Sequence, residues 1–425
     1  MLLEFRVRNY RSFSQESVLS LVASRDIDLL KTNTTATNIE SLPRAVRSAV
    51  VYGANASGKS NLLRAMQLMR GVVLESVSLQ PSQSFNVQPF RLDDALKSGP
   101  TLFEITIILD GIRHQYGFEF TPTRIVAEWL LVYQKAKPQR WFDRRFDTQS
   151  EKDVFEFSSF LAGQKRGWQD ATRPNALFLS TAVQLNSEQL RPLHSWFAES
   201  LIVLLEGGQV SFDVSTNMVQ TPEGQNAVTT LMGSADIAIS SISAVRRKGF
   251  RQFFSFDAAT GKADSQREEG EVLVPMFRHQ AGSVSADFEY LDESQGTQKL
   301  FSLAGPLLDI LNNGKVLVID ELDRSLHPLL VRQIVQTFQD QKRNERGAQL
   351  IFSTHDTSLL DNRLLRRDQV WLAEKRRDQS SELVPLTEFS PRKGEALEKG
   401  YLSGRYGGVP VLEERLNAGT RRGEK

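Results

Sequence analysis

Alternating apolar and polar residues predict several half-buried strands in the first third of the chain. Residues 2–10 (LLEFRVRNY) alternate in the way that one buried strand face requires. Three similar runs follow at 101–111, 112–120 and 124–133, and an Asp-Gly pair ends the first of them. Because these runs are short and evenly spaced, we expect an antiparallel meander.

A second pattern combines continuous apolar strands with helices. Residues 47–73 run from a β-branched strand through a glycine turn into a helix. Residues 288–339 read in order as strand, polar turn, helix, buried strand, loop and helix, and 348–361 add one more apolar strand. Strands that alternate with helices are typical of a parallel sheet. The sequence therefore predicts an α/β fold.

The region between these two groups has a mostly helical and less regular pattern. Its clearest segments are 175–208 and 234–245, and we expect helices in both. No sustained heptad run predicts a long coiled coil. Residues 416–425 are small and charged, which favours a frayed tail. The expected parts are an N-terminal lobe at 1–154, a mainly helical insertion at 155–245 and a C-terminal lobe at 246–425.

Composition narrows the classes of function. The 425 residues carry 52 basic and 51 acidic side chains, so no overall field attracts nucleic acid or a membrane surface. The absence of cysteine excludes disulfides, thiolate metal sites and cysteine nucleophiles. No apolar run approaches the roughly 20 residues of a membrane helix, and the charged N-terminus lacks a signal-peptide core. We therefore expect a cytoplasmic protein that does not bind membranes.

A phosphate-binding loop is the strongest chemical signal. Gly53, Gly58, Lys59 and Ser60 fit the pattern G-x-x-x-x-G-K-[ST] between a strand and a helix. Such a loop surrounds a polyphosphate with backbone amides and a helix N-terminus, while Lys59 reaches the β and γ phosphates and Ser60 binds Mg²⁺. We expect ATP or GTP as the ligand. The residues assigned to nucleotide binding are Asn55, Ala56, Ser57, Gly58, Lys59, Ser60 and Asn61.

Hydrolysis also needs carboxylates close to the bound phosphates. Asp320 and Glu321 follow the apolar run 316–319, at the strand end where open α/β sheets bind ligands. We expect Asp320 to hold Mg²⁺ and Glu321 to be the general base that activates water, although acidic residues can also simply form a turn there. His355 follows the strand 350–354 and is expected to contact the γ-phosphate or the attacking water. The alternative is a structural histidine.

Four stretches together, GANASGKSN, DESQGTQKLF, VLVIDELDRSLHP and IFSTHD, resemble the ABC-type ATPases of the SMC, RecF and DNA-repair group, which includes OLD-type proteins. The resemblance implies an ABC-type ATPase head that uses ATP. It implies that Arg11 contacts phosphate, with a surface arginine as the alternative. It also implies that Ser294 and Gly296 form a signature motif that completes the ATP site of an opposite subunit, so that ATP would join a homodimer. The signature has one glycine where the family usually has two.

The same resemblance implies three further roles with alternatives. A metal-contacting glutamine is expected between the phosphate-loop helix and the meander. Gln88 is the best-placed residue, with Gln80 and Gln83 close by. Asp323 and Ser325 match the loop that crosses the dimer interface, although Asp323 could instead cap the helix that starts near residue 328.

A narrower resemblance rests on RRDQVWLAEK at 366–375 and on EKGYLSGRYGGVPVL at 398–412. These stretches are similar to the AbiL and RloA type of bacterial abortive-infection ATPases, which are linked to anti-phage defence and are commonly encoded beside an effector. A packed aromatic ring and a salt bridge would account for Tyr406 and Arg405.

Three functions remain from these resemblances. The first is an ATPase sensor or scaffold whose ATP-dependent homodimer controls a separate effector, such as an RloB-type partner. The second is a RecF-like DNA-repair ATPase, for which the basic and aromatic stretch 243–254 would bind nucleic acid, unless it is a charged hairpin in solvent. The third is a transporter ATPase subunit. No Asp-x-Asp pair follows His355, so we do not expect the metal-dependent nuclease of OLD-type proteins.

Overall fold

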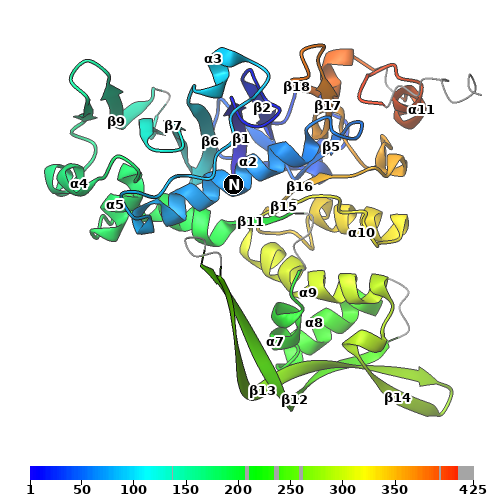
Figure 1. The fold of residues 1–425 in the computed structure, drawn as a ribbon. Helices are drawn as coiled ribbons and strands as arrows, with labels where there is room; N and C mark the ends of the chain where they lie inside the picture. Colours follow the sequence, from blue (N-terminus) through cyan, green and yellow to red (C-terminus); the bar gives the residue numbers. More distant parts are fainter. Residues whose placement is uncertain (136, 206–209, 234–238, 258–261, 392–393, 410–425) are drawn as a thin grey trace, which may run out of the picture. The chain divides into compact units, whose positions relative to one another are not determined.

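Strands that are far apart in the sequence pair in two large sheets of the computed structural model (Figure 1). The structure describes residues 1–135, 137–205, 210–233, 239–257, 262–391 and 394–409, with the backbone alone between 249 and 269. The chain divides into two units. The core unit comprises Met1–Glu206, Gly314–Leu322 and Val335–Lys425, and the insertion unit comprises Gly207–Asn313 and Asp323–Ile334.

A seven-stranded antiparallel sheet confirms the predicted meander. Its strand order is β10-β9-β8-β7-β6-β1-β2, and β1 joins the meander beside β6. Its strands are β1 (Leu2–Arg8), β2 (Ser17–Ser20), β6 (Thr101–Leu109), β7 (Ile112–Phe120), β8 (Ile125–Tyr133), β9 (Gln139–Asp147) and β10 (Lys152–Phe157).

A six-stranded sheet has the predicted parallel core. The order is β11-β15-β16-β5-β17-β18, and only β18 runs antiparallel to its neighbour. Every residue of β5, β15 and β16 is buried, as is typical of parallel strands that are covered on both faces. The strands are β5 (Ser48–Tyr52), β11 (Leu201–Leu204), β15 (Val316–Ile319), β16 (Gln349–Ser353), β17 (Val370–Lys375) and β18 (Ser381–Pro385).

Helix α2 (Lys59–Glu75) joins the two sheets through one hydrophobic core. Leu63 and Met66 of this helix share that core with Phe103 of the antiparallel sheet and Val318 of the parallel sheet. The helix thus starts at the phosphate-binding loop and is fixed along its length. The remaining core elements are α1 (Leu30–Asn33), β3 (Thr34–Ala36), β4 (Arg44–Val46), η1 (Ser76–Ser78), α3 (Asp94–Lys97), α4 (Lys165–Ala171), α5 (Phe178–Gln184), α6 (Arg191–Ser195), η2 (Trp196–Ser200), η4 (Thr357–Leu359), η5 (Arg367–Gln369), η6 (Leu386–Phe389) and α11 (Leu397–Leu402).

The insertion unit contains three packed helices and a three-stranded sheet. The hydroxyl of Ser215 on α7 donates to the carbonyl of Phe301 on α9 and accepts the Gly305 amide at 2.8 Å, which fixes these two helices together. The elements are α7 (Asp213–Met218), α8 (Pro222–Gly233), β12 (Ile239–Asp257), β13 (Lys262–Ala281), β14 (Val284–Glu289), η3 (Tyr290–Asp292) and α9 (Gln295–Asn313); α10 (Pro328–Gln339) begins in this unit.

The prediction of a helical middle region is wrong at two places. Strand β11 lies in the stretch 175–208, and strand β12 begins in the stretch 234–245. A short apolar run such as LIVL does not distinguish a buried helix from a strand, and the partner of β11 is β15, which is distant in sequence. The two units also divide the chain at different positions from the expected lobe boundaries. The predicted tail at 416–425 lies outside the described residues.

Candidate nucleotide-binding site

Three adjacent parallel strands bring the main motifs to one edge of the core sheet. Strand β16 pairs with β15 on one side and with β5 on the other. Because the strands are parallel, their carboxyl ends meet, and each end carries one motif. The phosphate-binding loop follows β5, Asp320 and Glu321 follow β15, and His355 follows β16. The strand that His355 follows thus lies directly beside the strand that Asp320 follows.

Lys59 lies inside the phosphate-binding loop. Its ammonium Nζ donates to the carbonyl oxygens of Gly53 at 2.8 Å and Ala54 at 3.3 Å, and the residue is only 7% exposed. Asn55 and Ala56 are exposed in the same loop. The loop thus surrounds a cation, and a polyphosphate can take the place of these carbonyl oxygens as its partner.

Two serines outside the phosphate-binding motif, Ser12 and Ser381, hold the loop and the start of α2 in place. The hydroxyl of Ser381 on β18 donates to the carbonyl of Ser57, and its amide donates to the carbonyl of Ser12, both at 2.6 Å. The side chain of Asn61 donates to the Ser12 hydroxyl at 2.9 Å. A Cβ atom on Gly58 would lie 2.3 Å from the Ser381 hydroxyl, so only glycine permits this contact. The sequence pattern gave no signal for Ser381.

Ser353, the last residue of β16, holds the side chain of Asp320 and the backbone of Glu321. The Ser353 hydroxyl donates to Oδ1 of Asp320 at 2.5 Å and accepts the Glu321 amide at 2.8 Å. Glu321 has a φ angle of 49°, which is uncommon for a residue other than glycine. Such strained backbone persists where neighbouring contacts hold it, and it is frequent at functional sites. Ser353 stands in the quoted motif IFSTHD, but sequence reasoning assigned it no role.

The carboxylate of Asp320 fits a metal ion. Asp320 is 6% exposed, and its Oδ2 atom is buried without a hydrogen-bond partner in the structure. An ionised oxygen of this kind is costly unless a cation or donor satisfies it. Among the described residues there is no cluster of three or more acidic or histidine side chains able to hold a metal. That suits Mg²⁺, which usually takes one or two protein ligands and completes its shell with phosphate oxygens and water.

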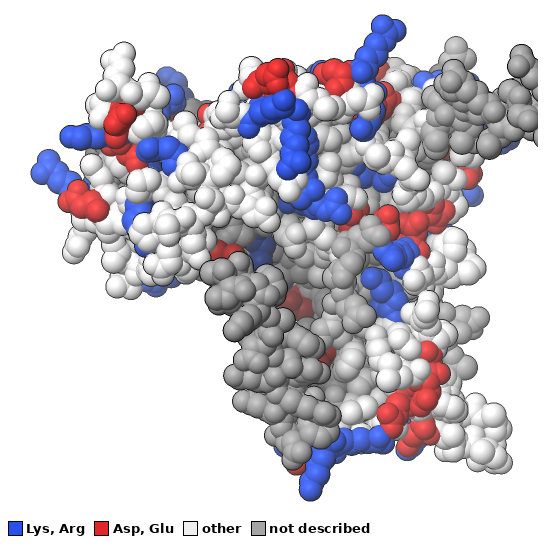
Figure 2. Space-filling view, viewed as in Figure 1, with Lys and Arg blue, Asp and Glu red and all other residues white. Residues whose placement is uncertain are grey.

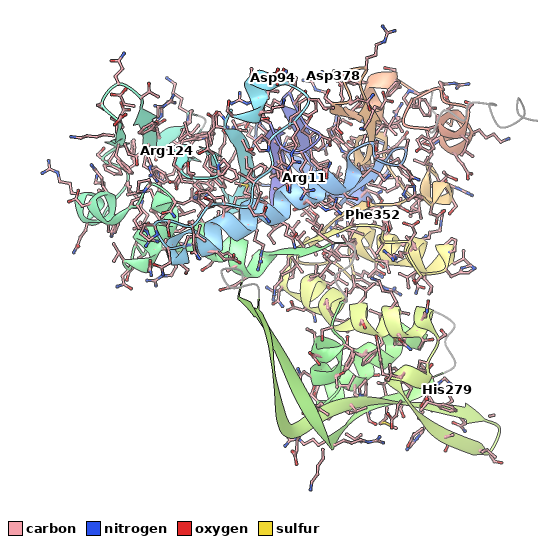
Figure 3. The ribbon with its side chains drawn as sticks, viewed as in Figure 1. Arg11, Asp94, Arg124, His279, Phe352 and Asp378 are labelled. Carbon is pink, nitrogen blue, oxygen red and sulfur yellow. The ribbon has the colours of Figure 1, made fainter. Side chains whose placement is uncertain are left out.

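Arg11 lies beside Gln88 in the core unit (Figure 3). The Arg11 amide donates to the Gln88 carbonyl at 2.7 Å, and its guanidinium Nε donates to the Tyr10 hydroxyl at 3.1 Å. The buried side chain of Asn9 fixes this turn, since it donates to the carbonyls of Leu96 and Gly99. The Asn-aromatic-Arg-Ser stretch therefore forms a rigid turn that presents Arg11.

The other two candidate glutamines lie in a different environment from Gln88. The Gln80 amide donates to Oε1 of Gln83 at 2.6 Å, and the Asn175 side chain donates to both of their carbonyls. These contacts give Gln80 and Gln83 a structural role in their turn. Of the three, Gln88 is the residue whose backbone contacts Arg11.

His355 is exposed at the end of the core strands. The residue that follows it is well anchored. The Tyr52 hydroxyl donates to the Asp356 carbonyl at 2.8 Å, and the Asp356 amide donates to the Thr354 hydroxyl at 3.0 Å. The backbone of His355 is thus fixed to the strand that carries the phosphate-binding loop, while its imidazole stays accessible to a ligand.

Ser294 and Gly296 belong to the insertion unit, at the start of α9. The Ser294 hydroxyl accepts the Thr297 amide at 3.2 Å, so Ser294 caps the helix. Ser294 is exposed, and Ser325 of the interface loop has its carbonyl 3.4 Å from the position of a Cβ on Gly296. At the start of α10, the Leu329 amide donates to Nδ1 of His327 at 3.2 Å, and this contact supplies the cap for which Asp323 was the candidate.

A phosphate-binding loop after β5 and paired carboxylates after β15, at one edge of a parallel sheet, are typical of the nucleotide site of an α/β ATPase domain. Residues 48–361 match the model of the AAA_21 family, described as "AAA domain, putative AbiEii toxin, Type IV TA system". This match covers well over half of the chain, and the protein belongs to that family.

A solved structure of an SMC head bound to the C-winged helix domain of ScpA is similar to this chain with a TM-score of 0.41 and 12% sequence identity, over 90% of this chain and 96% of that one. No curated protein matches the sequence. In the described part of the chain, no helix is both long enough and apolar enough to cross a bilayer.

Proposed function

We propose that the protein binds ATP with Mg²⁺, hydrolyses it between two copies of the chain, and acts as a sensor or scaffold that controls a separate effector in bacterial anti-phage defence. The observation that carries the proposal is the meeting of the phosphate-binding loop, Asp320 with Glu321, and His355 at one edge of the core sheet. The class of function is an ATPase, in agreement with the family.

Each residue of this edge has a distinct role in the proposal. Lys59 and the loop amides bind the β and γ phosphates, and Ser60, Asp320 and Gln88 hold the metal. Bound Mg²⁺ supplies positive charge against the phosphate oxygens. Glu321 accepts a proton from the attacking water, and His355 donates a hydrogen bond to the γ-phosphate. Arg11 adds a second positive charge to the phosphate site.

The homodimer follows from the exposed signature motif. Ser294 caps helix α9 and leaves the helix N-terminus accessible, and such an N-terminus favours an anionic ligand. The proposed ligand is the γ-phosphate that a second copy of the chain binds. The effector role rests on the toxin–antitoxin wording of the family description and on the resemblance to abortive-infection ATPases. The proposed location is the cytoplasm.

The test uses Glu321→Gln, which keeps the shape of the side chain but cannot accept the proton. Light scattering after size-exclusion chromatography should show that this variant forms a dimer with ATP and Mg²⁺ and remains a monomer with ADP. Lys59→Ala is the matched control and should stay monomeric with either nucleotide. If Glu321→Gln remains monomeric with ATP, the proposed dimer is wrong.

The RecF-like alternative has one observation in its favour. Arg246, Arg247 and Lys248 are exposed on β12 of the insertion unit. Two of them face acids, since Arg246 lies 3.6 Å from Glu271 and Arg247 pairs with Glu289. Basic and acidic side chains are interspersed over the face of the molecule in Figure 2. Arg251 of the same stretch lies in the part without described side chains.

Duplex DNA separates the two functions. A RecF-like ATPase should hydrolyse ATP faster when DNA is added, and its affinity for DNA should fall steeply with salt because lysine and arginine contacts release counterions. An effector scaffold should show neither response, and a pulldown from the native host should recover a second protein. A DNA-stimulated rate without any such partner would favour the alternative.

A further inference from the structure

The C-terminal motif GYLSGRYGG contacts the start of the phosphate-binding loop. The Tyr401 ring on α11 packs against the Tyr52 ring, with centroids 5.5 Å apart. Its hydroxyl donates to the Gly408 carbonyl at 3.0 Å. Tyr401 therefore contacts both the strand that leads into the phosphate-binding loop and the turn that follows α11.

The turn is shaped for close approach to the core sheet. Gly407 has a φ angle of 71°, and a Cβ atom at this position would overlap the carboxylate of Glu374 on β17. The Cβ position of Gly408 lies 3.7 Å from the Cα of Gly53, which is ordinary van der Waals contact. Gly408 also has a positive φ angle, of 69°, so the backbone of both glycines favours glycine where the turn lies against the phosphate-binding loop.

Tyr406 and Arg405 hold this turn to α11. Tyr406 is 1% exposed, its ring lies against Gly400, and its hydroxyl donates to Oε1 of Glu395 at 2.6 Å. Arg405 forms an ion pair with the same carboxylate, and its amide donates to the Gly400 carbonyl at 3.0 Å. Both readings from the sequence, a packed aromatic ring and a salt bridge, are confirmed. Together they make α11 and the turn one rigid piece.

Helix α11 also contacts the segment that follows His355. Oε1 of Glu398 accepts the Thr357 hydroxyl at 2.9 Å, and Thr357 is two residues beyond His355. Helix α11 therefore contacts the start of the phosphate-binding loop through the Tyr401 ring and the Gly408 turn, and it has one hydrogen bond to the His355 segment through Glu398. The phosphate-binding loop and the His355 segment are far apart in the sequence, and α11 contacts both.

We propose that α11 and the Gly404–Gly408 turn form a coupling element that fixes the His355 segment relative to the phosphate-binding loop, so that the site favours a nucleotide with a γ-phosphate. Tyr401 and Glu398 are positioning residues in this scheme. The proposal rests on the proposed ATP binding. ADP contacts the loop but has no γ-phosphate for His355, so it gains nothing from the coupling.

The experiment compares the affinities of the full chain for AMP-PNP and ADP, each with Mg²⁺, by calorimetry. The variants are Tyr401→Phe and Thr357→Val, which each remove one hydroxyl and little volume. Each should reduce the preference for AMP-PNP over ADP by about 3- to 10-fold, the usual worth of one hydrogen bond. The double variant should lose about as much as either single variant, because both break the same connection. Lys399→Gln, an exposed position on the same helix, should keep the wild-type preference.

Three results would overturn the inference. One is that both single variants prefer AMP-PNP over ADP as strongly as the wild-type protein does. Another is an equal loss of affinity for both nucleotides together with a lower unfolding temperature of the nucleotide-free protein, since that is the behaviour of a merely structural contact. A third is fully additive losses in the double variant. If the folded wild-type protein binds neither nucleotide, the proposed function itself is wrong, and the coupling is refuted with it.

Discussion

Removal of the Ser353 hydroxyl tests how the two acidic residues of the site are held. This side chain is fully buried at the end of β16, and it makes hydrogen bonds to the Asp320 carboxylate and to the Glu321 amide. Ser353→Ala removes one oxygen and keeps the strand. The Glu321 amide then loses its partner while its backbone is in the left-handed region. We expect both carboxylates to lose their fixed orientation.

The expected size follows from the two lost bonds. A hydrogen bond to a charged group contributes about 1.5–3 kcal/mol, and a neutral one about 1 kcal/mol. The free energy of unfolding should therefore fall by about 2–4 kcal/mol, which leaves a domain of ordinary stability folded. Because Ser353 orients a metal ligand, the apparent Mg²⁺ affinity or the hydrolysis rate should fall by about 10- to 100-fold.

Two assays check this expectation. Urea unfolding of the nucleotide-free protein gives the stability change, and ATP hydrolysis against Mg²⁺ concentration gives the change at the site. Ser180→Ala is a matched control, since Ser180 is a buried serine whose hydroxyl donates to the Val73 carbonyl at 2.6 Å away from the site. It should cost about 1 kcal/mol and leave the Mg²⁺ dependence unchanged. A wild-type Mg²⁺ dependence in Ser353→Ala would refute the reasoning.

Three further predictions concern the loop, the core and pH. Lys59→Ala should reduce the affinity for ATP beyond detection by calorimetry, because the loop loses its only side-chain cation; ATP binding at wild-type strength would contradict the assigned site. Arg144→Met should lower the free energy of unfolding by about 3–5 kcal/mol in urea titrations, because Glu128, buried 3.9 Å away, loses its cation; a change below 1 kcal/mol would contradict it. Burial lowers the pKa of His114 and His194 below the ordinary 6.5. Each histidine therefore binds its proton more weakly in the native state than in the unfolded chain, and the unfolding free energy should decrease as pH falls below 6.5. The double variant with glutamine at both positions should flatten this decrease, and an unchanged profile would exclude these histidines as its source.

The sequence predicted those strands and helices whose residue pattern is complete within one short stretch of the chain. The alternation of β6, β7 and β8 and the strand-loop-helix pattern around Lys59 need no distant partner to be recognised. The order of β5, β15 and β16 was also accessible in part, because parallel strands with motifs at their carboxyl ends must meet at one edge.

The contacts that hold the site could not be predicted in the same way. Ser353 and Ser381 act on residues of other strands, and their roles depend on which strands are neighbours. The same reason explains the error at β11, whose four residues become a strand only because β15 lies beside them. Tyr401 is a further example, since the Tyr52 ring that it packs against is near the opposite end of the chain.

The short core segment that contains the strand before Asp320 is connected at both of its ends to the insertion unit. The core segment Gly314–Leu322 is preceded by Asn313 and followed by Asp323, which both belong to the insertion unit. Inside the core, the segment is anchored by pairing of β15 with two strands and by the Leu322 amide, which donates to the Ser353 carbonyl at 3.1 Å. The segment that carries Asp320 and Glu321 is therefore joined covalently to the insertion unit on both sides, by connections only a few residues long. In the proposed function, this is the shortest path along the chain from a partner bound to the insertion unit to the two carboxylates.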